Sequence, residues 1–144
     1  STSPQTRLPS AQMRVAVCGA HLSGLPLNWQ LTERGARLLG STTSSPDYKL
    51  YALPGGPPYR PGMVRVGKGE QGAPIEVEVW ELPAREFGSF VAGIPAPLGI
   101  GTITLADGGD VQGFVCESYA VAEAVDITHF GGWRAYLNSL QQSG

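Results

Sequence analysis

His21 is the side chain in this sequence best placed to do acid–base chemistry. Glycines stand at positions 19 and 24, and small residues at positions 20 and 23. Such residues let backbone N–H groups point into a shared concavity, which suits a carboxylate or another anion. A histidine titrating near roughly pH 6.5 can act as acid or base beside it. The alternative is a histidine that only caps a turn or bonds a backbone carbonyl, and the local pattern alone favours that alternative.

Two arginines and a second histidine are further candidates. Arg60 and Arg65 flank a proline-rich loop, and either guanidinium could anchor a carboxylate through two hydrogen bonds. A solvated surface arginine is the commoner explanation for both. His129 precedes the last predicted helix, where a structural or solvent-exposed role is expected.

The acidic and aromatic residues are expected to be structural. Glu76 and Glu78 alternate on one strand face and are expected to form its solvated side. Three other glutamates end or open a predicted element but lack an acid–base partner: Glu81, Glu86 and Glu117. The tryptophans are expected to lie in the core: Trp29, Trp80 and Trp133.

Standard catalytic and metal-binding motifs are absent from the sequence. There is no GxSxG elbow, P-loop, CxxC or HExxH pattern. The two cysteines and two histidines lie far apart, without the spacing of zinc ligands. We therefore expect neither a metal nor a cofactor.

Composition excludes several classes of partner. The 144 residues carry a net charge of −2 and contain no cluster of lysine or arginine, so nucleic-acid binding is not expected. No apolar run is long enough for a membrane span, and the first residues lack the apolar core of a signal peptide. Cys18 and Cys116 lie in apolar stretches and are predicted to be buried free thiols in a reducing cytoplasm, which is favoured over the alternative of a disulfide between them.

Hydrophobic patterning predicts one domain, residues 13–144, behind a disordered leader at residues 1–12. Six or seven strands and three short helices are expected, with few crossover helices between strands. This order favours an α+β fold, a small mixed and mostly antiparallel β-barrel with short helices. Asn28 is the expected N-cap and Gly35 the stop of the first helix, and residues 107–110 predict a hairpin loop. The last helix is expected to bury four residues: Trp133, Tyr136, Leu137 and Leu140.

Several sequence blocks together resemble the C-terminal domain of the allophanate hydrolase family. The first is Gly19-Ala20-His21-Leu22-Ser23-Gly24-Leu25-Pro26-Leu27-Asn28. Later blocks follow in the same order, among them Tyr48-Lys49-Leu50-Tyr51, Arg60-Pro61-Gly62, Val79-Trp80-Glu81-Leu82-Pro83, Ile94-Pro95-Ala96-Pro97-Leu98-Gly99 and Phe130-Gly131-Gly132-Trp133. The resemblance covers roughly residues 13 to 140.

That domain is in turn similar to the γ-glutamylcyclotransferase-like fold, a small mixed barrel with a cavity beside its first strand. In that superfamily a Tyr-Gly-x-Leu loop holds the substrate carboxylate through backbone amides, and the matching positions here read Cys18-Gly19-Ala20-His21. The superfamily's catalytic glutamate would fall near Ala92-Gly93, where this chain has no carboxylate. The resemblance therefore implies the fold without cyclotransferase activity.

The resemblance also implies a place in urea degradation. In the allophanate hydrolase family an amidase-signature domain converts allophanate to N-carboxycarbamate, and the C-terminal domain is thought to promote loss of carbon dioxide. This chain shows no amidase motif and no Ser-Ser-Lys triad, so it is expected to be an excised domain or a free-standing relative. The expected partners are a small dicarboxylate-like substrate and an amidase domain in cis or in trans; assembly as a homodimer is left open.

His21 is the residue that we predict to be catalytic, as the general acid. The predicted substrate-binding residues are Gly19, Ala20, Leu22, Ser23, Gly24, Asn28 and Arg60. Two alternatives stay open: a non-catalytic module that binds a small carboxylate or supports an amidase partner, and a relative that acts on a different carbamate or amide.

Overall fold

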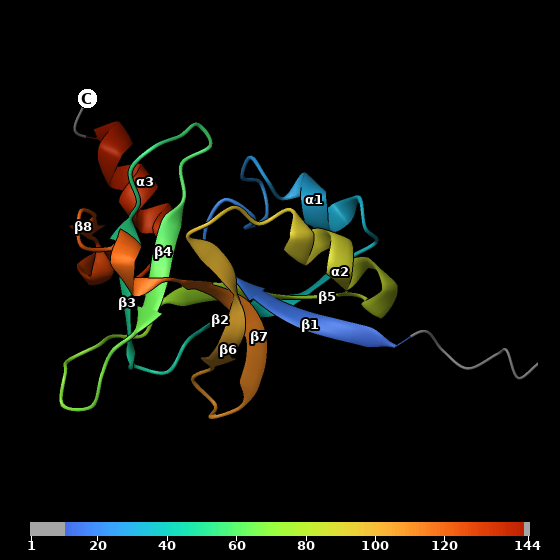
Figure 1. The fold of residues 1–144 in the computed structure, drawn as a ribbon, viewed down its shortest axis with the longest axis horizontal. Helices are drawn as coiled ribbons and strands as arrows, with labels where there is room; N and C mark the ends of the chain where they lie inside the picture. The colour runs from blue at the N-terminus through green and yellow to red at the C-terminus, as the bar shows by residue number, and fades with distance from the viewer. Residues whose placement is uncertain (1–10, 143–144) are drawn as a thin grey trace, which may run out of the picture.

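A five-stranded sheet forms the centre of the molecule (Figure 1). The computed structural model describes residues 11–142. The strands lie in the order β2 (Arg37–Thr43), β5 (Glu76–Pro83), β1 (Gln12–Val17), β7 (Asp110–Cys116) and β6 (Leu98–Thr104). β1 runs parallel to β7, and the other neighbouring pairs are antiparallel. The expected α+β fold with a mostly antiparallel sheet is confirmed.

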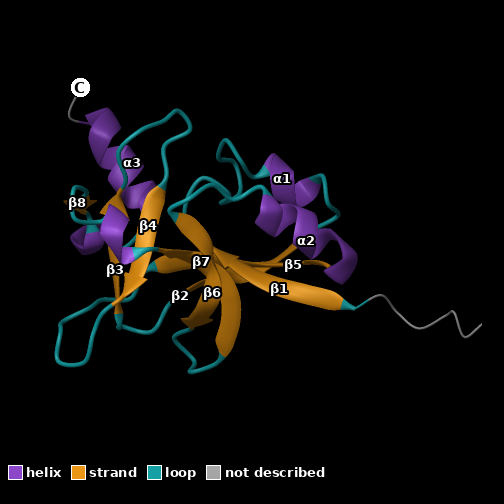
Figure 2. Ribbon diagram, in the orientation of Figure 1, coloured by secondary structure: helices purple, strands orange, loops and turns teal. Residues whose placement is uncertain are grey.

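A smaller sheet and three α-helices complete the fold. The sheet has the order β4 (Pro61–Arg65), β3 (Tyr48–Ala52) and β8 (Val125–Asp126). The helices are α1 (Trp29–Thr32), α2 (Ala84–Ala92) and α3 (Trp133–Gln142), with single 3₁₀ turns at η2 (Ser118–Ala120) and η3 (Thr128–Phe130). Figure 2 shows α1 and α2 side by side near β1 and β5, while α3 lies beside the small sheet. No helix among the described residues is long and apolar enough to cross a bilayer.

The large sheet is curled but not closed, so the expected barrel is corrected to an open sheet. In the described residues, β2 and β6 each pair with one neighbouring strand and form the two edges. The chain just beyond these edges meets at one bridge, between Ser44 and Leu105. Two flanking hydrogen bonds join the same segments, from Ser45 N to Thr104 O and from Ala106 N to Thr43 O. Strand twist thus brings the edges together at one end only.

The first strand starts slightly before the predicted domain boundary. β1 begins at Gln12, one residue before Met13, and Ala84 N donates to Ala11 O at 2.9 Å. The first ten residues of the predicted leader lie outside the described residues.

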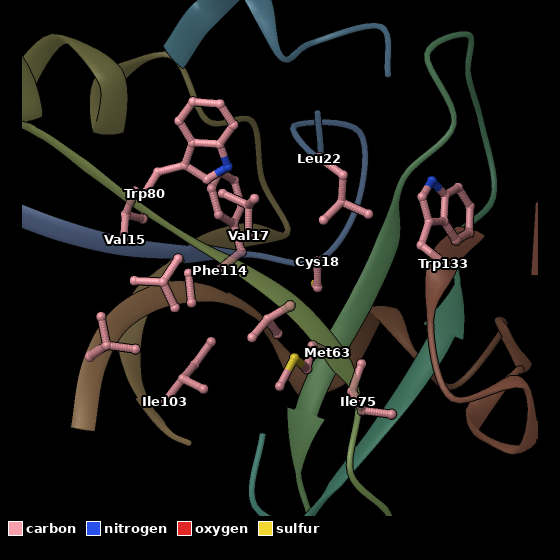
Figure 3. Packing of buried hydrophobic residues seen from close by; sticks show 14 of the residues in the cluster. Val15, Val17, Cys18, Leu22, Met63, Ile75, Trp80, Ile103, Phe114 and Trp133 are labelled. Atoms are coloured by element: carbon pink, nitrogen blue, oxygen red, sulfur yellow. The ribbon is translucent and has the colours of Figure 1, made fainter. Parts of the chain in front are cut away.

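The core is built around β1. Val15, Ala16 and Val17 are buried on consecutive positions, because β1 is covered on both faces. Figure 3 shows Trp80 and Trp133 at opposite ends of the cluster that surrounds these residues. Both tryptophans were expected there, but Trp29 is 52% exposed on α1, so the prediction that it is a core residue is wrong.

Several local predictions are confirmed and one is wrong. Gly35 has a φ of +76° after α1, as its predicted role as a left-handed stop requires, and the predicted hairpin joins β6 to β7. Asn28 holds the N-cap position of α1, as predicted, but its φ and ψ are helical and its side chain makes no capping hydrogen bond. Leu140 of α3 is 51% exposed, so the prediction that it is buried is wrong.

Glu78 of β5 is the buried charge of the fold, contrary to the expected solvated side. Its residue is 3% exposed. The carboxylate accepts hydrogen bonds from Ser23 N and Ser23 Oγ, both at 2.8 Å, and from Trp80 Nε1 at 3.1 Å. Arg134 of α3 lies 3.3 Å from it and also donates to Ser23 O. Glu78 therefore joins the loop after β1 to α3 through the sheet.

Hydrogen bonding keeps this buried carboxylate charged. Burial alone would raise the pKa of Glu78, but the bonds from Ser23 and Trp80 and the charge of Arg134 outweigh it, and the pKa is lowered. The folded state therefore gains stability from ionised Glu78 above its unfolded pKa, and loses it as the pH falls through the lowered folded value.

We predict that Glu78→Gln lowers the free energy of unfolding at neutral pH by about 2–3 kcal/mol, because it leaves Arg134 and Ser23 without a charged acceptor. Urea denaturation measures this loss. The control is Glu81→Gln on the same strand, whose partner Arg37 has a side chain 72% exposed and which should cost less than about 1 kcal/mol. Equal losses in the two variants would contradict the role assigned to Glu78.

Candidate functional site

A pocket opens beside the C-terminal end of β1. It encloses about 420 Å³, counting its open mouth. Its wall comes from the loop after β1, from α1, from the start of β4, from the segment before β6, and from β7. The lining residues include Cys18, Gly19, Ala20, His21, Gln30, Arg60, Pro61, Gly93, Ile94, Pro95, Leu98 and Phe114. The cavity expected beside the first strand is therefore present.

His21 lies in the wall of this pocket, and its residue is 7% exposed. The imidazole forms a three-ring cluster with Phe90 of α2 and Phe114 of β7, whose ring centroids lie 5.3 and 4.9 Å from its own and 5.8 Å from each other. Its Nε2 lies 2.7 Å from Gln30 Oε1, and its backbone carbonyl accepts from Asn28 Nδ2 at 2.8 Å. Contacts on the ring and on the backbone thus hold the side chain in one orientation.

The imidazole is neutral in the empty pocket near neutral pH. Burial lowers the pKa of His21, and the hydrogen bond with Gln30 opposes this only in part. The positive charges of Arg60 and Arg34 lower the pKa further. A bound anion would act in the opposite direction, because a negative charge favours the imidazolium.

Arg60 supplies the positive charge of the pocket. The residue is half-buried, and within the described part of the chain no hydrogen bond or ion pair ties its guanidinium. Arg65, the other candidate, is already occupied: it donates to Thr104 Oγ1 at 2.8 Å and lies 4.9 Å from the centroid of the Tyr48 ring. The structure therefore brings Arg60, and not Arg65, next to His21.

The loop after β1 offers backbone donors to the pocket. In residues 11–142 the N–H groups of Gly19, Ala20 and His21 have no backbone acceptor, whereas Leu22 N and Leu27 N are bonded within the loop. Glycine is required at position 19 by close packing, because an added Cβ would lie 2.3 Å from Cδ of Pro61. Three consecutive donors beside an arginine form a suitable wall for an anion.

The other predicted binding residues lie behind the pocket. Leu22 is fully buried in the core, and both donors of Ser23 are bonded to Glu78. Gly24 is exposed, with a φ of +81° that makes the turn, and Asn28 bonds the backbone of His21. These four residues shape the loop and do not line the cavity. The sequence prediction missed Gln30 and Phe114, which only the spatial meeting of α1 and β7 reveals.

The chemistry of the pocket is limited by two further features. Burial raises the pKa of the Cys18 thiol to about 12, with a smaller effect from Cys116, so Cys18 is not a thiolate nucleophile. Both cysteines are buried and free, as predicted. None of the described residues that line the pocket is acidic. Gly93 lies in the wall, near the position where the cyclotransferase superfamily has its catalytic glutamate. Within residues 11–142 no three metal-ligating side chains gather.

Comparison with known proteins agrees with this geometry. Residues 13–138 match the family model of the allophanate hydrolase C-terminal domain. The chain is 46% identical over 137 residues to urea amidolyase from Lachancea kluyveri, covering 93% of this chain and 7% of that protein. It therefore spans a small part of the curated relatives that it matches.

Solved structures extend the comparison to the fold. A Kluyveromyces lactis allophanate hydrolase is 42% identical with a TM-score of 0.86, covering 96% of this chain and 22% of that one. A uropathogenic E. coli-specific protein is 32% identical with a TM-score of 0.81, covering 89% of this chain and 97% of that one. A mouse AIG2-like protein, at 16% identity and a TM-score of 0.52, covers 76% and 78% and shows the fold alone.

The urea amidolyase and the allophanate hydrolase carry this region as a small part of a much longer chain, whereas the E. coli-specific protein consists almost entirely of it. The extent of the family match, the identity to urea amidolyase and the shared fold lead to one conclusion. The chain belongs to the allophanate hydrolase C-terminal domain family and has its γ-glutamylcyclotransferase-like fold.

Proposed function

We propose that this domain promotes the loss of carbon dioxide from N-carboxycarbamate produced by an amidase domain. His21 delivers the proton, while Arg60 and the N–H groups of Gly19, Ala20 and His21 hold the two carboxylates. The observation that carries the proposal is that His21 and Arg60 line one pocket whose described wall holds no carboxylate. Such a wall attracts a small dianion and lacks the base that cyclotransferase chemistry requires.

The proposed step needs one proton. In N-carboxycarbamate a nitrogen joins two carboxylates, and the bond from this nitrogen to one carboxylate carbon breaks. Its electron pair moves to nitrogen, which takes the proton from the imidazolium of His21, and carbon dioxide leaves. A dianion and one proton thus give carbamate, a monoanion, and carbon dioxide. The imidazole returns to its neutral form and is ready to take up another proton.

The lowered pKa of His21 is compatible with this role. The empty pocket keeps the imidazole neutral, because burial and two arginines disfavour a further positive charge. The negative charges of the bound dianion stabilise the imidazolium, so binding raises the pKa of His21 and the imidazole takes up a proton. The proton donor is therefore formed only when the substrate is present.

Malonate, a dianion of similar size, should bind more tightly as the pH falls from about 8 to about 6. His21 takes up a proton on binding, so affinity should rise by up to about tenfold for each pH unit between the lowered pKa of the empty protein and the raised pKa of the complex. Thermal shift or calorimetry measures this, with a stabilisation of about 2.7 kcal/mol at a hundred times the Kd.

Two variants control the malonate experiment. His21→Gln keeps a polar side chain but cannot titrate, so it should retain only the pH dependence of malonate itself. Arg60→Ala should abolish binding, whereas Arg37→Ala, which removes an exposed arginine far along the sheet at β2, should not. Binding that survives Arg60→Ala would place the anion elsewhere.

Replacing His21 with alanine should remove the acceleration of carbon dioxide release. With an amidase generating N-carboxycarbamate in situ, we expect the rate to fall by about 10²–10⁴-fold from the wild-type level, or to the uncatalysed background if that is reached first. Mass spectrometry of released carbon dioxide measures the rate, and circular dichroism checks folding. His129→Ala, at the exposed η3 turn, should release carbon dioxide at the wild-type rate. An unchanged rate in His21→Ala excludes the histidine from the step.

A non-catalytic anion-binding module is the second candidate. It is favoured by the neutral state of His21 in the empty pocket, since a buried neutral imidazole also serves as a hydrogen-bond partner without transferring a proton. The two candidates differ in one result: a module of this kind binds malonate through Arg60 but does not raise the rate of carbon dioxide release above background.

A further inference from the structure

The hydrogen bond between His21 and Gln30 decides which ring nitrogen can do chemistry. Gln30 comes from α1, is half-buried and lines the pocket. Its Oε1 lies 2.7 Å from His21 Nε2. An amide oxygen can only accept a hydrogen bond, so the neutral imidazole must carry its proton on Nε2 to make this contact.

The other nitrogen of the ring faces accessible space. Among residues 11–142, Nδ1 of His21 has no hydrogen-bond partner, and no fully buried side-chain nitrogen or oxygen is without one. Nδ1 is therefore not sealed in the core. The ring contacts Phe90 and Phe114 and bonds Gln30 at Nε2, and the accessible space that His21 lines is the pocket, so the pocket is the space available to Nδ1.

Gln30 is itself held from two sides. Its backbone N–H donates to Leu27 O at 3.0 Å, and its carbonyl accepts from Arg34 Nη1 at 2.9 Å. Arg34 also donates from Nε to Ser89 Oγ of α2 at 3.0 Å and lies 5.9 Å from the centroid of Phe90. The pair of helices therefore fixes Gln30 relative to the aromatic ring that contacts His21.

We propose that Gln30 is a positioning residue that fixes the tautomer of His21, so that Nε2 keeps its proton and Nδ1 is the atom that takes up a proton and passes it to the substrate. This inference rests on the proposed function for the last step alone. In it, the substrate nitrogen receives the Nδ1 proton, and the hydrogen bond to Gln30 is unbroken throughout. The charged groups that face the ring are Arg60 from the loop before β4 and Arg34 from the turn after α1.

The tautomer can be measured without substrate. Long-range nitrogen–proton NMR on protein labelled with ¹⁵N at histidine distinguishes a proton on Nε2 from one on Nδ1 in the neutral ring, and His129→Ala protein assigns the His21 signal. We expect the Nε2–H form alone in the wild type. In Gln30→Leu we expect that preference to be lost and the rate of carbon dioxide release to fall by about 10–100-fold.

A carboxylate at position 30 tests the same contact by strengthening the hydrogen-bond acceptor at Nε2, where Gln30→Leu removes it. Gln30→Glu keeps the acceptor at Nε2 and adds a negative charge, so the imidazolium should persist to a pH higher by about 1–3 units, and the activity with it. The matched control is Thr32→Glu, which places the same charge on an exposed residue of α1 without a contact to the ring. It should leave the tautomer as in the wild type and shift the titration far less.

Two outcomes would overturn the inference: an Nδ1–H tautomer in the wild type, or a Gln30→Leu protein with the wild-type tautomer and pH profile. The tautomers are measured by NMR on protein without substrate, and the pH profile is measured separately. A failure of the proposed function would instead show as an unchanged rate of carbon dioxide release in His21→Ala protein. Rescue of the Nε2–H form and of activity by Gln30→Glu, but not by Gln30→Leu, supports a positioning role over a purely structural one.

Discussion

The buried carboxylate of Glu78 is the constraint on which the site depends. A charge in the interior of a sheet is tolerated only when every lone pair finds a donor, and the donors here come from Ser23, Trp80 and Arg134. Satisfying that requirement fastens the loop after β1 to β5 and to α3. His21 lies two residues before Ser23, so the same bonds that satisfy Glu78 also decide where the imidazole lies.

The pocket that results combines a neutral histidine with an arginine that has no partner in the described chain. Burial against two phenyl rings removes water from the imidazole, and the nearby guanidinium further disfavours its protonation. A doubly charged anion in the pocket offsets both effects, because its negative charge stabilises the imidazolium. The apolar surroundings that keep His21 neutral therefore also make its protonation sensitive to what occupies the pocket.

Much of the fold could be predicted from hydrophobic patterning, because β5 alternates and the loop at residues 107–110 carries unambiguous turn chemistry. The site could be predicted only in part. His21, Gly19 and Ala20 are neighbours in sequence, but the sequence did not decide between Arg60 and Arg65, and Gln30 and Phe114 meet His21 only through tertiary packing. Glu78 was misplaced because alternation alone cannot show that a strand is covered on both faces; Trp29 was misplaced because a four-residue helix has no clear apolar stripe.

The sign of the charge in the pocket also limits the class of reaction. A cyclotransferase-like mechanism removes a proton from an amine, and so it needs a carboxylate in the wall. Here Gly93 and Ile94 occupy the wall near that position, so both the base and its negative charge are missing. Without that charge a dianion is no longer repelled, and Arg60 attracts it. A pocket with a histidine and with no carboxylate in its described wall is suited to a reaction in which a proton is delivered. Breaking a bond from nitrogen to a carboxylate carbon is such a reaction, because the departing nitrogen must gain a proton as its electron pair is released.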